Sequence, residues 1–286
     1  PDIPEVPNAG GRTFVQGAHR RSVACSLACV DMKKLHLVVL SDFGYVNGGN
    51  AAVALASARG LARRGHAVTL LSAVGATTPS DDPDGVRLVS TDQQEILTDS
   101  NRMRAILQGT WNVTAARMLR ALLRDLDPAC TVVHLHSWTQ ALSSSVVRAA
   151  LAVGVRVVYT MHDYFSLCPN GTFFNHQQNE ICRLRPMSLS CIASHCDKRS
   201  YSHKLWRILR QAVQAHRGGI PNRILDFIAV SPFSHAILAP GLPAGARVYH
   251  VPSPIEVSRD VPARVAANGA FVMVGKITQG KGAIVF

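Results

Sequence analysis

The sequence predicts an α/β protein in which helices cover both faces of a parallel sheet. Short, continuous apolar segments alternate along the chain with segments in which apolar residues recur at helical spacing. Continuous apolar segments are typical of strands buried on both faces, whereas surface strands alternate apolar and polar residues. Strands that alternate with helices in this way favour a doubly wound parallel sheet.

The first strand–helix–strand unit covers residues 35–71 and contains a glycine-bearing loop. Gly48 and Gly49 lie in this loop, where the absence of a Cβ atom allows a sharp turn and a close approach to a ligand. We expect Asn50 to be the N-cap of the helix that follows. The free backbone N–H groups at the start of this helix predict an anion-binding site.

The glycines leave two interpretations of this loop open. A dinucleotide-binding loop has the pattern G-x-G-x-x-G directly after the strand, whereas here Gly44 precedes Gly48 and Gly49 by several residues. NAD or FAD is therefore the less favoured ligand. The alternative is that the glycines serve only a tight turn in an α/β protein.

The later elements continue the alternation. We expect strands over residues 86–89, 131–135, 155–159, 224–230 and 247–251, and helices over 101–107, 113–126, 139–153, 201–216 and 231–238. Residues 32–251 are thus predicted to form one domain, 252–269 a linker, and 270–286 the first strand and loop of a second domain. Residues 1–31 have no periodic pattern, so we expect a disordered extension outside the fold, in which Cys25 and Cys29 carry no chemistry.

Histidines follow two of the predicted strands. His134 and His136 lie at the end of the strand over 131–135, and His162 with Asp163 follows the next strand. Because the carboxyl ends of parallel strands meet at one edge, we expect these side chains to line one cleft. Each histidine alone is as consistent with a core position, but three at one edge favour a functional site.

Residues 165–199 break the strand–helix alternation and contain four cysteines: Cys168, Cys182, Cys191 and Cys196. Four thiols in a segment too polar to pack by itself suggest a structural zinc that replaces a missing hydrophobic core. The spacing is not that of paired C-x-x-C motifs, so buried free thiols and disulfides remain alternatives.

The composition indicates anionic partners. The net charge is +12 and the isoelectric point is about 9.9, which favours nucleotide phosphates or phospholipid headgroups. The basic residues are scattered and no nucleic-acid-binding motif accompanies them, so we expect no nucleic-acid partner. No apolar run is long enough to span a bilayer.

Residues 201–216 are predicted to form a basic amphipathic helix, with Leu205 and Leu209 on one face and Lys204 and Arg210 alongside. Such a helix is consistent either with peripheral contact with an anionic membrane or with a domain helix that has a solvated face. We expect a cytoplasmic protein that contacts the inner face of the membrane peripherally.

Several separated segments together resemble a retaining family-4 glycosyltransferase of the GT-B type, which has two facing Rossmann-like domains. They are Gly48-Gly49 with GHAVTLL at 65–71, VVHLHSW at 132–138, TMHDYFSLCPNG at 160–171, FIAVSPFSHAIL at 227–238, VPSPIEV at 251–257 and VGKITQGKG at 274–282. The cysteine-containing loop also resembles an insertion in bacterial members that build surface polysaccharides. The resemblance implies that residues 32–251 are the acceptor-side domain and that the donor-side domain is truncated, so this chain alone is expected to be inactive.

The resemblance also implies roles for individual residues. His162 would point toward the transferred sugar, and Asp163 would orient the acceptor or the imidazole. The loop of Gly48, Gly49 and Asn50 would face the donor diphosphate and the acceptor. Lys276 and Lys281 would neutralise the leaving diphosphate, so that no cofactor is required for catalysis. His134, His136 and Ser231 would line the cleft.

The sequence departs from the family pattern at three places. Gly280 replaces an acidic residue, Ser253-Pro254 replaces Asn-Gly, and the Glu-x7-Glu segment is absent. The implied activity is transfer of a sugar with retention from a UDP-, GDP- or ADP-sugar to a glycan or lipid-linked acceptor, in bacterial surface polysaccharide synthesis. The alternatives are a nucleotide-sugar epimerase of the same fold and a non-catalytic acceptor-binding or scaffold half.

Overall fold

The computed structural model describes residues 34–75, 80–254 and 269. The strands are β1 (His36–Phe43), β2 (Ala67–Val74), β3 (Ser80–Asp81), β4 (Val86–Ser90), β5 (Thr131–Leu135), β6 (Arg156–Met161), β7 (Phe174–Asn175), β8 (Glu180–Ile181), β9 (Asp226–Ala229) and β10 (Arg247–His250). The helices are α1 (Gly49–Arg63), α2 (Arg102–Thr110), α3 (Val113–Leu123), α4 (Ser145–Val153), α5 (Leu189–Ala193), α6 (Tyr201–Val213) and α7 (Pro232–Leu238). Short 3-10 or π turns cover Pro128–Cys130, Gln214–Gly218 and Ala239–Gly241.

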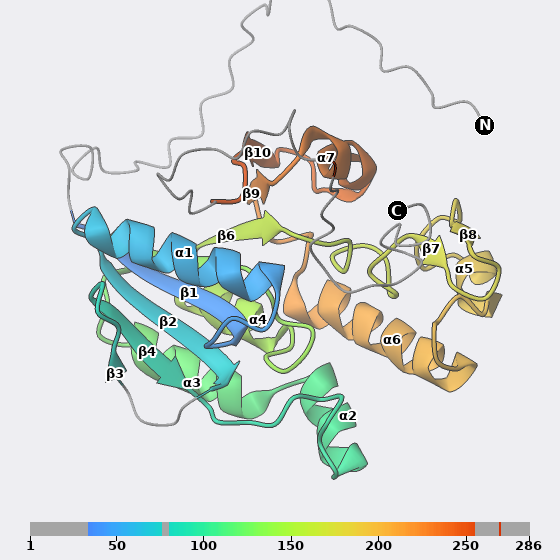
Figure 1. Ribbon diagram of the computed structural model, residues 1–286, viewed down its shortest axis with the longest axis horizontal. Helices are drawn as coiled ribbons and strands as arrows, with labels where there is room; N and C mark the ends of the chain where they lie inside the picture. Colours follow the sequence, from blue (N-terminus) through green and yellow to red (C-terminus); the bar gives the residue numbers. More distant parts are fainter. Residues whose placement is uncertain (1–33, 76–79, 255–268, 270–286) are drawn as a thin grey trace, which may run out of the picture.

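A single large sheet organises the described residues (Figure 1). Its eight strands have the order β10-β9-β6-β5-β1-β2-β4-β3, and all neighbouring pairs are parallel except β3 with β4. The predicted Rossmann-like α/β class is therefore confirmed. The antiparallel edge strand β3 was not predicted, because its two residues are too few to give a periodic pattern.

Helices cover both faces of the sheet, and the alternation of side chains along β1 explains how. Leu37 and Val39 point toward α1, where they pack in one apolar cluster with Ala54 and Ala58. Their neighbours Val38 and Leu40 point to the other face and join the larger cluster that includes α3 and α4. Because successive residues of a strand face opposite sides, a continuous apolar run serves both layers.

The chain between β5 and α4 differs from the prediction. A helix over 139–153 was expected, but α4 begins only at Ser145. The preceding segment is held as a loop by the carboxylate of Asp42, at the end of β1, which accepts hydrogen bonds from the backbone N–H groups of Gln140, Ala141 and Leu142. A tertiary contact almost a hundred residues away in sequence thus delays the helix.

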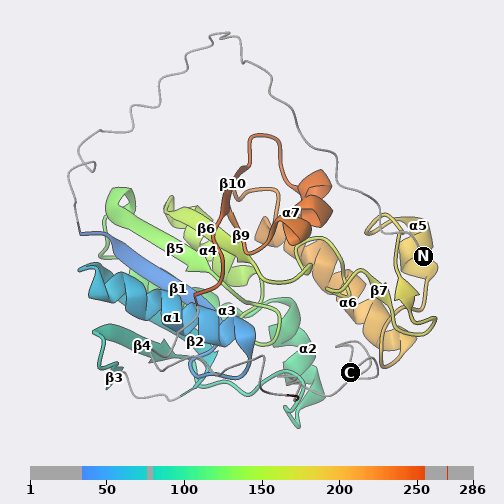
Figure 2. The same cartoon turned by 45° about the horizontal axis from the view of Figure 1, so that its top comes forward.

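The segment over 165–199 forms a small unit beside α6 (Figures 1 and 2). It contains the hairpin β7–β8 and the five-residue helix α5, and several of its apolar side chains face solvent, such as Ile181 and Leu189. Asn170 and Asp197 connect this unit to Arg207 of α6. Polar contacts therefore replace much of the hydrophobic core that the segment lacks.

Helix α6 buries polar side chains rather than its leucines. Lys204, Arg210 and Gln211 are buried, whereas Leu205 and Leu209 are about half exposed. The helix is amphipathic as predicted, but its inward face binds the polar unit of residues 165–199 and the loop that precedes α4. None of the described helices is long and apolar enough to cross a membrane.

Of three further predictions, two can be compared with the structure. Asn50 is not the N-cap of α1: the cap is Gly48, and Asn50 lies inside the first turn. The predicted extension over 1–31, the strand over 270–274, and nearly all of the predicted linker over 252–269 lie outside the described residues.

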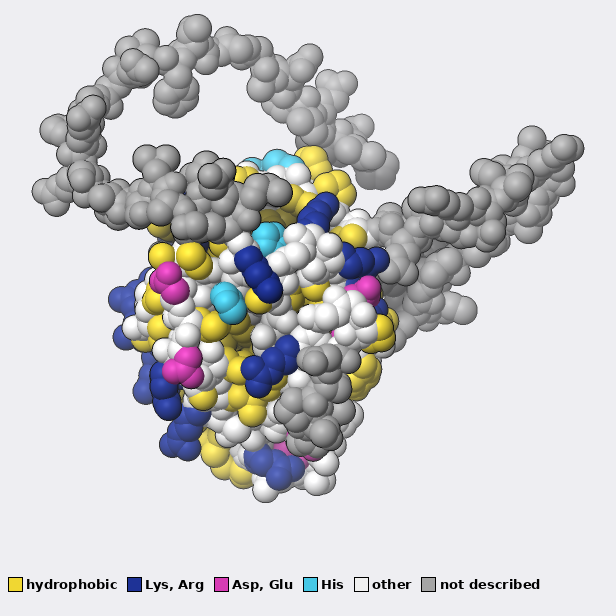
Figure 3. Space-filling view, turned by 90° about the vertical axis from the view of Figure 1, so that its left-hand side faces the viewer, with side chains coloured by type: hydrophobic (Ala, Val, Ile, Leu, Met, Phe, Trp, Pro, Cys, Tyr) yellow, Lys and Arg dark blue, Asp and Glu magenta, His cyan; other side chains and the backbone are white. Residues whose placement is uncertain are grey.

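Lys and Arg side chains are spread over the face shown in Figure 3 rather than gathered in one patch, as the scattered sequence pattern predicted.

Two glycines provide a test of this backbone. Gly154 ends α4 in the left-handed region at φ 82°, so Gly154→Ala is expected to lower the free energy of unfolding by about 1–2 kcal/mol. Gly60 lies inside α1, and a Cβ atom added there would meet open space. Gly60→Ala is therefore expected to raise the free energy of unfolding by about 0.5–1 kcal/mol. Urea denaturation of both variants measures the difference, and stabilisation by Gly154→Ala would contradict the assigned helix end.

Candidate functional site

Three histidines meet at the carboxyl edge of the sheet, as their positions at the ends of β5 and β6 predicted. The Nδ1 atom of His136 and the Nε2 atom of His162 are 3.0 Å apart, at hydrogen-bond distance. The ring centroids of His134 and His136 are 4.2 Å apart, and Nε2 of His134 lies 2.7 Å from the hydroxyl of Thr160. The structure therefore brings together the histidines that the sequence placed on two separate strands.

Hydrogen bonding assigns the protons of His136 and His162. The Nε2 atom of His136 is buried and has no hydrogen-bond partner among the described residues. A proton there would be a buried donor without an acceptor, which is costlier than an unused lone pair. The proton of His136 is therefore on Nδ1 and is donated to Nε2 of His162. His162 in turn carries its proton on Nδ1, so it presents a donor rather than a base.

The histidines are neutral at physiological pH because they are removed from water. Burial lowers the pKa of His162 to about 4, and burial together with the nearby His162 lowers that of His134 to about 4. The pKa of His136 is also well below its ordinary value, chiefly because of burial. A group of neutral imidazoles can donate hydrogen bonds without adding positive charge.

Asp163 lies next to this group and connects it to the start of α1. Burial raises the pKa of Asp163 to about 6, while hydrogen bonds from the Phe165 backbone and from the Asn50 side chain lower it and the nearby Asp42 raises it. The Phe165 N–H lies 3.1 Å from Oδ1 of Asp163. Of the predicted loop of Gly48, Gly49 and Asn50, the side chain of Asn50 therefore contacts the predicted Asp163.

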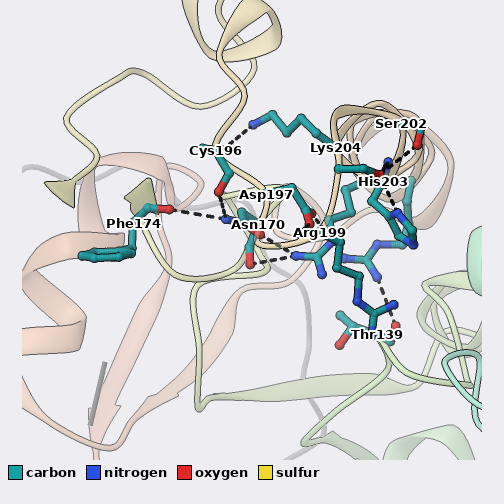
Figure 4. Close-up of polar contacts among 12 residues, drawn as sticks. Thr139, Asn170, Phe174, Cys196, Asp197, Arg199, Ser202, His203 and Lys204 are labelled. Atoms are coloured by element: carbon teal, nitrogen blue, oxygen red, sulfur yellow. Dashed lines mark hydrogen bonds and ion pairs between the residues drawn. The ribbon is translucent and has the colours of Figure 1, made fainter. Parts of the chain in front are cut away.

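Sequence reasoning missed Asp42 and Arg210, which lie behind the site. Asp42 is fully buried, and burial raises its pKa although its three backbone hydrogen bonds and the nearby Arg210 oppose this. Burial lowers the pKa of Arg210 to about 10, and its guanidinium lies over the ring of Phe165. The guanidinium also donates a hydrogen bond to the carbonyl oxygen of Thr139, which Figure 4 labels. Ser41 and Asp42 end the apolar run of β1, which could have marked Asp42 as a strand-end polar residue.

A cavity of about 500 Å³ opens beside the histidines, between α1 and the sheet. His134, His136 and Thr160 form its polar part, and Val53, Ile228 and Val230 belong to its apolar walls. His162, Asp163 and Ser231, which were also predicted to line the cleft, are not among the residues that line this cavity. Ser231 has another role. It is the N-cap of α7, where its side chain accepts a hydrogen bond from the N–H of Ser234, as the sequence also predicted.

The four predicted metal ligands lie near one another, and Cys168, Cys191 and Cys196 also lie near Lys204. Cys168, Cys191 and Cys196 are buried and Cys182 is half-buried, and all four are free thiols. Burial raises the pKa of Cys182, and the other three thiols raise it further. Within the described residues, however, no group of three or more His, Cys, Asp or Glu side chains is arranged to hold a metal ion. Lys276 and Lys281 lie outside the described residues.

The family model for the glycosyl transferase 4-like domain matches residues 48–221. The chain belongs to this family. The matched part of the glycosyltransferase domain includes the start of α1, the histidines and Asp163, and the cysteine-containing unit. No curated protein matched the chain in the sequence comparison.

Among solved structures, the Arabidopsis thaliana protein UGT89C1, crystallised with quercetin, is similar to the glycosyltransferase domain. The superposition has a TM-score of 0.41 and 13% sequence identity, and it covers 82% of this chain and 54% of that chain. This chain thus spans about half the length of that protein.

The opposed pKa shifts predict how stability depends on pH. Between pH 6.5 and 4 the unfolded chain binds protons at His134 and His162 that the folded protein does not, so acidification destabilises the fold. Asp163 acts oppositely, because its folded pKa of about 6 exceeds the ordinary 3.8. Asp163→Asn is therefore expected to lose more stability than the wild type between pH 6.5 and 4.

Urea denaturation at the two pH values measures this difference. Asp125→Asn is the matched control, because Asp125 is an exposed carboxylate on the surface. The control is expected to follow the wild type. An Asp163→Asn profile that also follows the wild type would show that the pKa of Asp163 is not raised by the fold.

Proposed function

We propose that this chain is the acceptor-side domain of a retaining glycosyltransferase, which transfers a sugar from a nucleotide-sugar to an acceptor hydroxyl. Membership of the glycosyl transferase 4-like family supports a transferase. The observation that carries the proposal is the neutral His162, which is held by His136 and is followed in the chain by Asp163, the residue that the Asn50 side chain in the first turn of α1 contacts. A neutral donor suits an uncharged sugar hydroxyl, and a helix N-terminus suits a phosphate.

His162 and Asp163 have different roles in this proposal. His162 donates a hydrogen bond to an oxygen of the transferred sugar and cannot act as the base, because His136 occupies its lone pair. Asp163 orients the acceptor hydroxyl or the imidazole, and its pKa of about 6 keeps it mostly ionised at neutral pH. Gly48 permits a close approach to α1, since nothing lies within 4 Å of the Cβ position there.

The remaining assignments rest on the family resemblance of the sequence. The donor would be a UDP-, GDP- or ADP-sugar, and the acceptor a glycan or a lipid-linked saccharide in bacterial surface polysaccharide synthesis. Lys276 and Lys281 would bind the leaving diphosphate. Peripheral contact with an anionic membrane at the inner face of the membrane would give access to a lipid-linked acceptor.

Release of nucleoside diphosphate tests the activity. The assay combines UDP-, GDP- and ADP-sugars with mixed glycan acceptors, and compares this chain with a version extended through the downstream coding sequence. Acceptor-dependent release by the extended chain supports the proposal. No release by the shorter chain supports its assignment as an acceptor-side half. Conversion of the sugar without an acceptor would indicate an epimerase instead, and no release by either chain would favour a scaffold.

Substitution of His162 provides the second test, and it is made in whichever of the two chain lengths is active. His162→Ala is expected to reduce turnover by roughly 100-fold or more, the usual effect of removing one preorganised donor. His162→Asn keeps an amide N–H near the position of Nδ1 and is expected to retain more activity. His216→Ala, which alters an exposed histidine, is the control. Unchanged turnover of His162→Ala would place the reaction elsewhere.

A further inference from the structure

Helices α2 and α6 lie side by side and present apolar side chains to solvent (Figures 1 and 2). On α2, Met103 and Leu107 are 67% and 64% exposed, and Ile106 is also exposed. On α6, Leu205 and Leu209 are about half exposed. Residues three or four positions apart share one face of a helix, so each helix carries one outward apolar stripe. We call these five side chains the α2–α6 apolar face.

A hollow of about 220 Å³ lies between the two helices. Ile106 lines it from α2, and Trp206, one turn before Leu209, lines it from α6. The helices approach closely at Gly109, where an added Cβ atom would lie 2.8 Å from the ring of Trp206. The two apolar stripes therefore border the same hollow.

The charged side chains of α6 do not interrupt the α2–α6 apolar face, because they lie on the inward side of the helix. Lys204 is buried and donates to the Sγ atom of Cys196 at 3.1 Å (Figure 4). Arg207 pairs with the buried Asp197, and Arg210 is buried against the loop before α4. The leucines of α6 are thus left to face solvent without charged neighbours on their own side.

The segments that form the α2–α6 apolar face are positively charged. From the loop before α2 to the end of α3, residues 96–123 contain four arginines and one acidic residue, Asp99, which is buried and paired with Arg104 at 2.7 Å. Residues 201–218, which cover α6 and the turn after it, contain four Lys or Arg residues and no acidic residue. A two-fold contact between copies of this chain would bring like charges together, whereas an anionic surface is complementary.

We propose that the α2–α6 apolar face binds the surface of a bilayer that contains anionic lipids. Its apolar side chains enter the boundary between headgroups and acyl chains, and the exposed arginines Arg102 and Arg104 at the start of α2 lie among the headgroups. Binding of this kind grows with the apolar area that leaves water and with attraction to anionic lipid. The inference deepens the peripheral contact of the proposed function, and it rests on that function for the lipid-linked acceptor that the contact would serve.

Co-sedimentation with vesicles tests the proposal without donor or acceptor, so the outcome does not depend on transferase activity. The chain is expected to pellet with vesicles of phosphatidylglycerol and phosphatidylcholine far more than with phosphatidylcholine alone. Met103→Ser combined with Leu107→Ser is expected to weaken this binding by about tenfold or more, because two large apolar side chains no longer contribute to it. The matched control is Ile181→Ser combined with Phe233→Ser, which alters two side chains that are each 73% exposed but lie on neither helix.

Fluorescence of Trp206 gives a second measurement that needs no serine variant. Brominated acyl chains quench tryptophan at short range, so brominated phosphatidylglycerol vesicles are expected to quench the wild type. Trp206→Phe is expected to lose most of this quenching, because Trp111 lies beneath the guanidinium of Arg217 and Trp138 is buried.

Four outcomes would overturn the proposal. They are no binding of the wild type to the anionic vesicles, equal weakening by the control pair, unchanged quenching in Trp206→Phe, and a dimer in light scattering that Met103→Ser with Leu107→Ser dissociates. The last outcome would assign the α2–α6 apolar face to a second copy of the chain. Vesicle binding by a chain that transfers no sugar would support this inference and count only against the proposed function.

Discussion

The buried carboxylate of Asp42 is the contact on which the site depends. It accepts three backbone hydrogen bonds from residues 140–142. The backbone N–H of Asp42 also donates a hydrogen bond to the hydroxyl of Ser137 at 2.9 Å. These bonds join the end of β1 to the loop that follows β5. Because a carboxylate without partners is very costly in the interior, the loop is fixed in the one conformation that satisfies it.

The same contact determines the position of the histidines. His136 immediately precedes the loop that Asp42 holds, and its backbone N–H also bonds to the carbonyl oxygen of Leu40 at 2.9 Å. A fixed His136 in turn fixes the ring of His162 through the bond between Nδ1 and Nε2. The position of the His162 ring thus results from a chain of hydrogen bonds that begins in the centre of the sheet.

Helix α6 connects this region to the cysteine-containing unit. Its inward side carries Arg210 toward the loop before α4 and Lys204 toward Cys196. A helix that buries a lysine and an arginine needs acceptors along its whole length, and carbonyl oxygens, carboxylates and thiols supply them here. The unit of residues 165–199 and the loop at the carboxyl edge of the sheet are therefore attached to the same helix.

The sequence by itself determined the fold class and most of its elements, because burial on both faces of a parallel sheet leaves a periodic signal. The strand over 131–135 matches β5, and the helix that begins at Ser231 and ends at Leu238 matches α7 with its cap. It also placed His134, His136, His162 and Asp163 at one edge, since strand ends are visible in the chain order.

Only the tertiary structure decided how these residues interact. The late start of α4, the side chain of Asn50 on Asp163 rather than at a helix cap, and the thiols on Lys204 all depend on partners far away in sequence. Periodicity reports which residues are buried but not which polar groups they meet. Hydrogen bonds and ion pairs require distances of about 3 Å, which only the packed chain establishes.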